Sequence, residues 1–314
     1  MRKVLYLSHA TPEVYSIIRQ AVPAGFELIT LESNSDDERI EKIASCEVVI
    51  VAATPLRERV IDAARRLELV HHQGVGWQDT TDHEVLKARG IPLALTLEGT
   101  TTGVAEHTVL LMLAVLKLLP FADSELRQGR FHVNALRPVS RELCGLTVGY
   151  IGMGRIAQAV AGRLRAFETR GIFYDPNVVD ASGIQYRSLE QVLEEADVVT
   201  LHVPLTPQTR HMIGASQLAR MKRGAYLVNA SRGGLVDEAA LVSALQSGHL
   251  AGAALDVFES EPMPAGHPLS RLDNVVLTPH IAAGTRDALA TKMQAIFANL
   301  ERFYSGEPLQ NRVF

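Results

Sequence analysis

Short apolar runs alternate with amphipathic stretches through the first hundred residues of the chain. Such a βα alternation is typical of strands that form a parallel sheet and are separated by helices. The pattern therefore predicts an α/β domain in this part of the chain. Its strands are expected at residues 4–7, 26–29, 48–52, 69–72 and 92–95.

Residues 103–119, GVAEHTVLLMLAVLKLL, are apolar on almost every helical face. A helix of this kind is expected between domains or subunits rather than on a surface, so we interpret it as a crossover helix. Its longest apolar run, Val109–Leu116, ends at Lys117 and is shorter than the roughly 20 residues that span a bilayer. Residues 120–145 become polar and irregular, which predicts a loop leading into a second domain.

A second alternating series begins at Thr147 and predicts a doubly wound sheet. Helical spacing of apolar residues returns between Asp287 and Tyr304, in a stretch that is free to return to the first domain. We therefore expect an α/β protein with two domains. The strands of the second series are expected at residues 148–151, 171–174, 198–201, 225–228, 251–255 and 275–277.

The composition fits a soluble globular protein: 314 residues, 47% of them hydrophobic and 21% charged, suit two domains. A formal net charge of −4 gives no basic field that would attract nucleic acid or a membrane surface, so a small ligand is expected. Cys46 and Cys144 lie far apart and form no metal-ligand pattern, which predicts no metal site and fits a reducing cytoplasm. The basic start, Met1–Lys3, precedes an apolar stretch too short for a signal peptide.

The clearest local motif is Gly152–Ala157, GMGRIA, between the strand-like TVGYI and a helical stretch. Gly152 permits a tight turn, Gly154 lets the backbone approach a pyrophosphate, and Ala157 is small enough for the helix to pack on the strand. The free amides at the helix N-terminus then face the diphosphate. Strand, fingerprint and helix together indicate a dinucleotide site.

Asp175 ends the next strand-like run, about twenty residues further on, where a ribose-binding carboxylate is expected. A carboxylate there accepts hydrogen bonds from the adenosine ribose and repels a 2′-phosphate. The sequence therefore predicts NAD rather than NADP as the cofactor. The alternative is an exposed turn aspartate before Pro176.

Three charged residues follow strand-like runs of the second series: Arg232, Glu261 and His280. Ligands bind at the carboxyl ends of the strands in an open α/β sheet, so all three are expected on the same edge as the fingerprint. Taken singly, they are also compatible with a surface turn, an exposed loop and a strand end, respectively. Their shared position is what predicts a common site.

Hydride transfer to a 2-keto acid needs a cation for the substrate carboxylate and a proton donor for the carbonyl oxygen. Arg232 offers a planar fork that matches a carboxylate in two parallel hydrogen bonds. His280 is the expected proton donor, because histidines titrate near working pH. Glu261 beside it favours the charged imidazolium and holds the ring in place. We therefore predict these three as the catalytic residues.

Four segments, in their order and spacing, resemble the D-isomer-specific 2-hydroxyacid dehydrogenases. The likeness extends to QGVGWQD at 73–79 and to the helix at 103–117, and so covers nearly the whole chain. The four segments are GMGRIA at 152–157, NASRGGLVDE at 229–238, LDVFESEP at 255–262 and LTPHIAAGT at 277–285.

The resemblance implies two doubly wound domains, one inserted into the other. A Rossmann NAD-binding domain at 99–286 would interrupt a flavodoxin-like catalytic domain, which binds the substrate and is made of residues 1–98 and 287–314. The resemblance also implies a homodimer, with the 103–119 region at the interface.

The same resemblance implies separate roles for the site residues. Arg232 would bind the substrate carboxylate and carbonyl, His280 would act in acid–base catalysis, and Glu261 would pair with that histidine. The backbone of Val75 and Gly76 would contact the substrate carboxylate. Asp256 would face the carboxamide of the nicotinamide ring. The residues implied around NAD, besides the fingerprint glycines and Asp175, are Arg155, Ile156, Val203, Ala230, Ser231 and Asp256.

Two positions depart from the family pattern: Thr100 stands where many members have asparagine, and Phe131 where a tryptophan is often found. Neither change touches the catalytic group. The substrate side chain is expected to meet residues 51–54 and Trp77. Because 51–54 contain no arginine or lysine, the phosphate grip of a phosphoglycerate dehydrogenase is not evident, although Arg57 is near. The sequence therefore favours an uncharged or small side chain.

The predicted activity is hydride transfer between NAD(H) and a 2-keto or 2-hydroxy acid of D configuration. Phosphoglycerate dehydrogenase and phosphite dehydrogenase activities stay open as alternatives. Formate dehydrogenases pair their histidine with glutamine, so Glu261 argues against that activity. Outside enzymes, the alternative is an NADH-responsive binding module similar to the C-terminal-binding co-repressors, against which the compact length of the chain argues.

Overall fold

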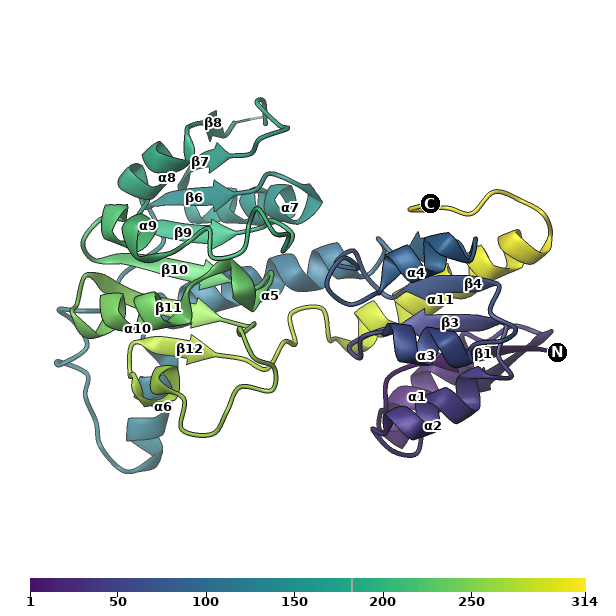
Figure 1. Ribbon diagram of the computed structural model, residues 1–314. Coiled ribbons are helices and arrows are strands. Elements are labelled where there is room, and N and C mark those ends of the chain that lie inside the picture. Colours follow the sequence, from purple (N-terminus) through teal and green to yellow (C-terminus); the bar gives the residue numbers. More distant parts are fainter. Residues whose placement is uncertain (182) are drawn as a thin grey trace. The chain divides into compact units, whose positions relative to one another are not determined.

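Every apolar run that the sequence predicts as a strand lies in one of two parallel sheets (Figure 1). The structure is a computed structural model, and it describes residues 1–181 and 183–314. These residues form two compact units, and the second is inserted into the first. Unit 1 comprises Met1–Thr100 and Gly284–Phe314, and unit 2 comprises Thr101–Ala283.

The sheet of unit 1 has the strand order β2-β1-β3-β4-β5, which is the predicted flavodoxin-like order. Helices α1 and α11 pack on one face of this sheet, and α2, α3 and α4 pack on the other. Both faces are therefore buried, which explains why the strands are continuous apolar runs. The strands are β1 (Arg2–Tyr6), β2 (Phe26–Ile29), β3 (Val48–Val51), β4 (Leu69–His72) and β5 (Leu93–Leu95). The helices are α1 (Pro12–Gln20), α2 (Asp36–Ile43), α3 (Glu58–Ala63), α4 (His83–Ala88) and α11 (Arg286–Tyr304).

The sheet of unit 2 has the order β12-β11-β10-β9-β6-β7-β8, which is a Rossmann order extended by one strand. Helices α5 and α7 pack on one face, and α8, α9 and α10 pack on the other. The strands are β6 (Thr147–Ile151), β7 (Arg170–Tyr174), β8 (Gln185–Tyr186), β9 (Val198–Leu201), β10 (Ala225–Asn229), β11 (Leu250–Leu255) and β12 (Val275–Leu277). The helices are α5 (Thr100–Leu116), α6 (Leu119–Arg127), α7 (Arg155–Leu164), α8 (Leu189–Glu195), α9 (Ala215–Arg220) and α10 (Glu238–Gln246), with 3-10 turns at Arg165–Phe167, Gly233–Leu235 and Pro268–Arg271.

The order of the strands reverses between β6 and β9 in unit 2. From β6 the chain continues through β7 and β8 on one side, whereas β9 to β12 follow on the other. The connecting segments diverge at this point, and in doubly wound sheets ligands bind at such a switch point, beyond the carboxyl ends of the strands. This edge is where the predicted fingerprint and catalytic residues lie.

The boundaries between the two units differ slightly from those that the sequence suggests. Residues 99–100 and 284–286 belong to unit 1, not to the inserted domain. Gly99 packs closely on α11, because a Cβ at this position would lie 2.6 Å from the carbonyl oxygen of Ala288. Thr285 caps the same helix by accepting a hydrogen bond from the Ala288 amide at 3.1 Å. Residues on either side of the insertion therefore contact α11.

The prediction of a loop over residues 120–145 is wrong at its start, where α6 forms. Leu118 adopts a left-handed φ of +49°, and α5 and α6 are bent by 63° there. Pro120 is tolerated in the first turn of the new helix, and Asp123 pairs with Arg127 one turn later. Among the described residues no single helix is long and apolar enough to cross a membrane; only α5 and α6 taken together would pass.

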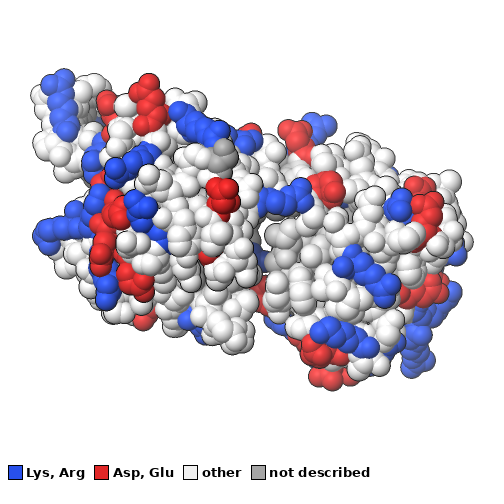
Figure 2. Space-filling model, turned by 90° about the horizontal axis from the view of Figure 1, so that it is seen from above, with Lys and Arg blue, Asp and Glu red and all other residues white. Residues whose placement is uncertain are grey.

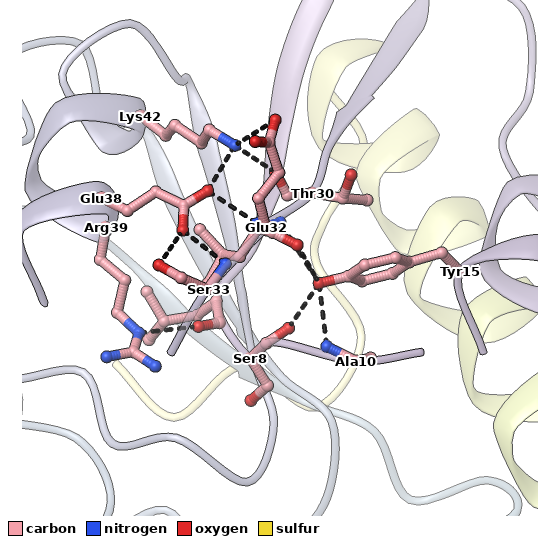
Figure 3. A network of polar contacts seen from close by, with 11 residues as sticks. Ser8, Ala10, Tyr15, Thr30, Glu32, Ser33, Glu38, Arg39 and Lys42 are labelled. Atoms are coloured by element: carbon pink, nitrogen blue, oxygen red, sulfur yellow. Dashed lines mark hydrogen bonds and ion pairs between the residues drawn. The ribbon is translucent and has the colours of Figure 1, made fainter. Parts of the chain in front are cut away.

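A network of polar contacts joins the loops at the carboxyl edge of the unit 1 sheet (Figure 3). The hydroxyl of Tyr15, on α1, accepts hydrogen bonds from the amides of Ala10 and Leu31 at 3.0 and 3.2 Å. It also lies 2.9 Å from the carbonyl oxygen of Leu31, to which it donates. Ser8 Oγ accepts from the amide of Thr54 at 2.9 Å. The loops after β1, β2 and β3 are therefore tied to one another.

Candidate functional site

The fingerprint Gly152–Ala157 forms the turn between β6 and α7. Gly152 has a φ of +92°, and a Cβ there would lie 2.6 Å from the carbonyl oxygen of His202, so the turn requires glycine. Gly154 is the N-cap of α7, and a Cβ at this position would meet nothing within 4 Å. The backbone of the turn is thus tightly packed at Gly152. At Gly154, beside the first amides of α7, there is open space.

Asp175 follows β7, and its carboxylate is tied to the fingerprint. Its Oδ2 accepts a hydrogen bond from the amide of Met153 at 2.8 Å, and its Oδ1 accepts from the amides of Asn177 and Val178 at 2.8 and 3.0 Å. An ionised carboxylate has about four acceptor directions, so one is left for a ribose hydroxyl. This geometry is compatible with the predicted role.

The other residues predicted around the cofactor lie along the same edge. Arg155 and Ile156 open α7, Val203 follows β9, and Ala230 and Ser231 follow β10. A Cβ at the fingerprint's first glycine would lie 2.8 Å from Val203 Cγ1, so the turn faces the end of β9 across the switch point. A glycine-rich turn, a helix N-terminus and an acid at the next strand end together fit a dinucleotide.

Arg232, Glu261 and His280 follow β10, β11 and β12, which are neighbouring parallel strands. Nδ1 of His280 lies 2.8 Å from Oε2 of Glu261. Oε1 of Glu261 accepts a hydrogen bond from the amide of Phe258 at 3.0 Å. The His280 and Glu261 side chains remain 47% and 37% exposed, so they are accessible to a ligand.

The charges of this group act on one another. Burial acts to raise the pKa of Glu261, but hydrogen bonds from His280 and Phe258 and the positive charge of Arg232 lower that pKa overall. Glu261 is therefore ionised at neutral pH. The negative charge of Glu261 therefore lies beside Nδ1 of His280 and interacts with the positive charge of Arg232. The three predicted residues thus lie in one electrostatic cluster.

Asp256 holds the loop that carries His280. It is fully buried, and its Oδ1 accepts from the Thr278 hydroxyl at 2.6 Å and the Ile281 amide at 2.9 Å. Its Oδ2 accepts from the Ala282 amide at 2.9 Å, and its carbonyl oxygen accepts from the His280 amide at 2.7 Å. His280 itself has a left-handed φ of +53°. Asp256 therefore fixes this turn, and its contact with a nicotinamide carboxamide stays a prediction.

His107, on α5, belongs to the same group and was not singled out from the sequence. Its Nε2 lies 3.0 Å from Thr278 Oγ1 and 3.4 Å from Asp256 Oδ1. Burial acts to raise the pKa of Asp256, but the hydrogen bonds from His107, Thr278 and the loop amides lower it. Although His107 stands in the motif GVAEH, nothing local in an apolar helix indicates that its ring reaches a distant strand end.

Val75 and Gly76 lie in unit 1, in the loop after β4. The carbonyl oxygen of Gly76 accepts from the Thr80 hydroxyl at 3.1 Å, and Thr80 Oγ1 lies 2.9 Å from Nε2 of the buried His72. Because the hydroxyl gives its single proton to Gly76, His72 Nε2 must be the donor to Thr80. Hydrogen bonds through Thr80 therefore connect this loop to His72 of β4. Its contact with the substrate stays a prediction.

Comparisons with known proteins identify the family of the chain. The NAD-binding domain model of the D-isomer specific 2-hydroxyacid dehydrogenases matches residues 109–282. A glyoxylate reductase of Korarchaeum cryptofilum is 40% identical over 281 residues, which cover 87% of this chain and 84% of that protein. A D-3-phosphoglycerate dehydrogenase of Archaeoglobus fulgidus is 37% identical over 316 residues, which cover 99% of this chain but only 59% of that longer protein.

Among solved structures, an NADPH-dependent glyoxylate/hydroxypyruvate reductase from Sinorhizobium meliloti is similar, with a TM-score of 0.86 at 32% identity. The match covers 100% of this chain and 98% of the other. Fold, site geometry and sequence similarity thus lead to the same assignment. The chain belongs to the D-isomer specific 2-hydroxyacid dehydrogenase family, and its unit 2 contains the NAD-binding domain of that family.

Proposed function

We propose that the protein is an NAD-dependent oxidoreductase that transfers a hydride between NAD(H) and a 2-keto or 2-hydroxy acid of D configuration. One observation carries the proposal. The 2.8 Å pair of His280 and Glu261, with the charge of Arg232 acting on it, lies at the same sheet edge as the dinucleotide turn. The named relatives, which include a glyoxylate reductase and a phosphoglycerate dehydrogenase, support this class of reaction.

In the direction of reduction, the carboxylate and carbonyl oxygen of the keto acid pair with the guanidinium of Arg232. NADH, which the turn at Gly152–Ala157 and Asp175 would hold, would supply the hydride for the carbonyl carbon, and the C=O electron pair would then reside on the oxygen. His280, protonated and oriented by Glu261, gives its proton to this oxygen and regains one from solvent. In oxidation the same steps run in reverse, with His280 as the base.

We propose further that NAD is preferred to NADP. The carboxylate of Asp175 would accept a hydrogen bond from a ribose hydroxyl and would repel a 2′-phosphate. Asp175→Ala should lower the ratio of kcat/KM for NADH to that for NADPH by about tenfold or more, the effect of about 1.4 kcal/mol. Steady-state kinetics with both cofactors checks this, and an unchanged ratio would contradict the assignment.

The substrate side chain is proposed to be small or uncharged. Arg57, the cation nearest in sequence to residues 51–54, pairs with Asp82 at 3.0 Å and donates to the carbonyl oxygen of Asp79 at 3.1 Å. Two of the five N–H donors of its guanidinium are thus engaged within unit 1. The phosphoglycerate dehydrogenase alternative would require the remaining donors of Arg57 to bind the substrate phosphate.

The decisive experiment is an assay of NADH consumption with glyoxylate, hydroxypyruvate, pyruvate, phenylpyruvate and 3-phosphohydroxypyruvate as substrates. Phosphite is tested separately, by measuring the formation of NADH from NAD. We expect turnover on one of the small keto acids. A preference for 3-phosphohydroxypyruvate or for phosphite would select the corresponding alternative. Saturable NADH binding without turnover on any compound would overturn the enzyme proposal in favour of an NADH-responsive binding module.

We also propose a homodimer that uses the 103–119 region. Apart from Met1 and Val179, every large apolar side chain that is at least half exposed among the described residues lies between 110 and 139. Such a concentration is typical of a protein interface. Sedimentation analysis should give a dimer that Leu110→Glu weakens, and a monomeric wild-type protein would refute this. The exposed residues are Leu110, Leu119, Leu126, Phe131, Val133 and Val139.

A small-molecule partner and a reducing compartment such as the cytoplasm complete the proposal. Figure 2 shows Lys, Arg, Asp and Glu side chains intermixed on the face in view, which offers no field of one sign for nucleic acid or a membrane surface. Both cysteines are free thiols, with Cys46 buried and Cys144 exposed, as is usual in reducing compartments. Cell fractionation followed by immunoblotting tests the location.

A further inference from the structure

Two glutamates outside the catalytic group connect the loop that carries Glu261 to the segment that carries Arg232. The amide of Glu259 donates to Oε1 of Glu238 at 2.7 Å, and the amide of Glu238 donates to Oε1 of Glu259 at 3.1 Å. Each carboxylate therefore holds the backbone of the other residue. Glu238 is the first residue of α10, whereas Glu259 lies in the loop after β11, so the contact joins separate elements.

Each of these carboxylates also has a histidine partner. Nε2 of His267 lies 3.2 Å from Oε2 of Glu238, and Nε2 of His211 lies 3.1 Å from Oε1 of Glu259. Nδ1 of His267 accepts from the amide of Leu269 at 3.4 Å, so the ring proton is on Nε2 and is donated to Glu238. These donors offset the repulsion between the two neighbouring carboxylates and fix the orientation of Glu238.

The backbones of the two connected segments are in direct contact. A Cβ at Gly233, the residue after Arg232, would lie 1.9 Å from the carbonyl carbon of Phe258. The loop after β11 therefore packs against the Arg232 turn with no intervening side chain. A shift of the Phe258–Glu259 peptide would displace Glu261, because the N–H of the preceding peptide, that of Phe258, is the hydrogen-bond donor to Glu261 Oε1.

We propose that Glu238 is a positioning residue for the catalytic pair. Within the loop, Glu261 accepts the Phe258 amide, and Glu238 supplies from α10 the acceptor for the next amide, that of Glu259. By holding this peptide, Glu238 sets the place from which Glu261 reaches His280. The role extends the proposed hydride transfer and rests on it for its kinetic readout.

Glu238→Ala tests the role without removing the helix start, because Asp237 caps α10 by accepting from the Ala240 amide at 3.0 Å. We expect kcat for keto-acid reduction to fall about tenfold or more, since a small displacement of a catalytic group is costly. The KM for NADH should change little, because the dinucleotide turn makes no part of this contact. Glu238→Gln keeps an acceptor oxygen for the Glu259 amide but loses the acceptor for His267 Nε2, so it should recover part of the lost kcat.

Glu190→Ala is the matched control. Glu190 also lies in the first turn of a unit 2 helix, α8, where it accepts from the Ser188 hydroxyl at 2.9 Å. This substitution should leave kcat unchanged. A loss in Glu238→Gln equal to that in Glu238→Ala, or no loss in either, would overturn the proposal.

Hydrogen–deuterium exchange gives a readout that is independent of activity. Peptides covering residues 256–262 should exchange faster in Glu238→Ala than in the wild-type protein or in Glu238→Gln. Faster exchange in a protein that reduces none of the keto acids would support the connection and refute the proposed reaction. Unchanged exchange together with unchanged kcat would refute the connection alone. Where Glu238→Ala lowers the unfolding temperature sharply, the comparison of Glu238→Gln with Glu190→Ala decides.

Discussion

Gly233 is the residue at which the catalytic loops leave no room for a side chain. Because a Cβ there would lie 1.9 Å from the Phe258 backbone, Gly233→Ala must push the two loops apart. We expect a fall in kcat of roughly hundredfold, the cost of about 1 Å of misplacement, and a lower unfolding temperature. Gly234→Ala is the control, since its Cβ would first meet the flexible Leu205 side chain at 3.1 Å. Equal effects of the two substitutions would contradict this reading of the turn.

The pair of Glu261 and His280 predicts a specific pH dependence. The pKa of Glu261 is lowered, so its carboxylate is ionised across the working range and places a negative charge beside Nδ1 of His280. Glu261→Gln removes this charge while keeping the size of the side chain. The pH above which keto-acid reduction fails should therefore move to lower pH, as measured from kcat/KM profiles. An unmoved limb would mean that another group sets the proton donor.

At the scale of elements, the sequence was sufficient where a pattern is local and insufficient where it is not. The strands were predictable because they are buried on both faces, and Arg232, Glu261 and His280 were predictable because each follows such a strand. Helix α6 was missed because its short, polar sequence has no long apolar stripe, although Pro120 in its first turn was a usable signal. The two-residue β8 is too short to produce a pattern.

The contacts around the catalytic group could not be predicted for a different reason. His107 reaches Thr278 across 171 positions, and Glu238 meets Glu259 only because α10 and the loop after β11 pack together. Such pairs depend on how the elements pack, and the spacing of residues along the chain does not indicate that packing. These residues lie within the sequence motifs, but only the folded structure shows which atoms they contact.

The attachment of α1 to the loops of unit 1 gives a prediction at the same scale. Tyr15→Phe would leave the amides of Ala10 and Leu31 without their acceptor (Figure 3). Burying unsatisfied polar groups costs about 1–3 kcal/mol, so the free energy of unfolding should fall by about that amount in urea titrations. Tyr186→Phe, at an exposed tyrosine, should change it little. A similarly small change for Tyr15→Phe would show that water replaces the hydroxyl.

Across the whole molecule, each unit has a histidine whose pKa is strongly lowered: His71 is buried in unit 1, and His202 is half-buried in unit 2. Burial lowers the pKa of His71 in unit 1 to about 3 and that of His202 in unit 2 to about 4. His71 is held by Asn299 Nδ2 at 3.0 Å from its Nε2, which joins β4 to α11, and Thr200 Oγ1 lies 3.1 Å from His202 Nε2. Both rings are thus packed and hydrogen-bonded in the neutral form.

These histidines predict that the protein loses stability in mild acid. In the unfolded chain they titrate near pH 6.5, so below that pH the unfolded state binds protons that the native state does not bind. The free energy of unfolding should therefore fall as the pH drops from 6.5 to 5, with each histidine adding up to about 1.4 kcal/mol per pH unit. Carboxyl groups contribute little in this window, because they titrate near 4.5 or below in the unfolded chain.

Urea titrations at several pH values measure this slope, and His71→Gln separates the contribution of unit 1. A glutamine there can still accept a hydrogen bond from Asn299 but binds no proton, so the slope between pH 6.5 and 5 should become shallower. The exposed His9→Gln is the control and should leave the slope unchanged. If His71→Gln keeps the wild-type slope, the ring is already protonated in the folded protein, and the hydrogen bond from Asn299 to its Nε2 cannot exist as described.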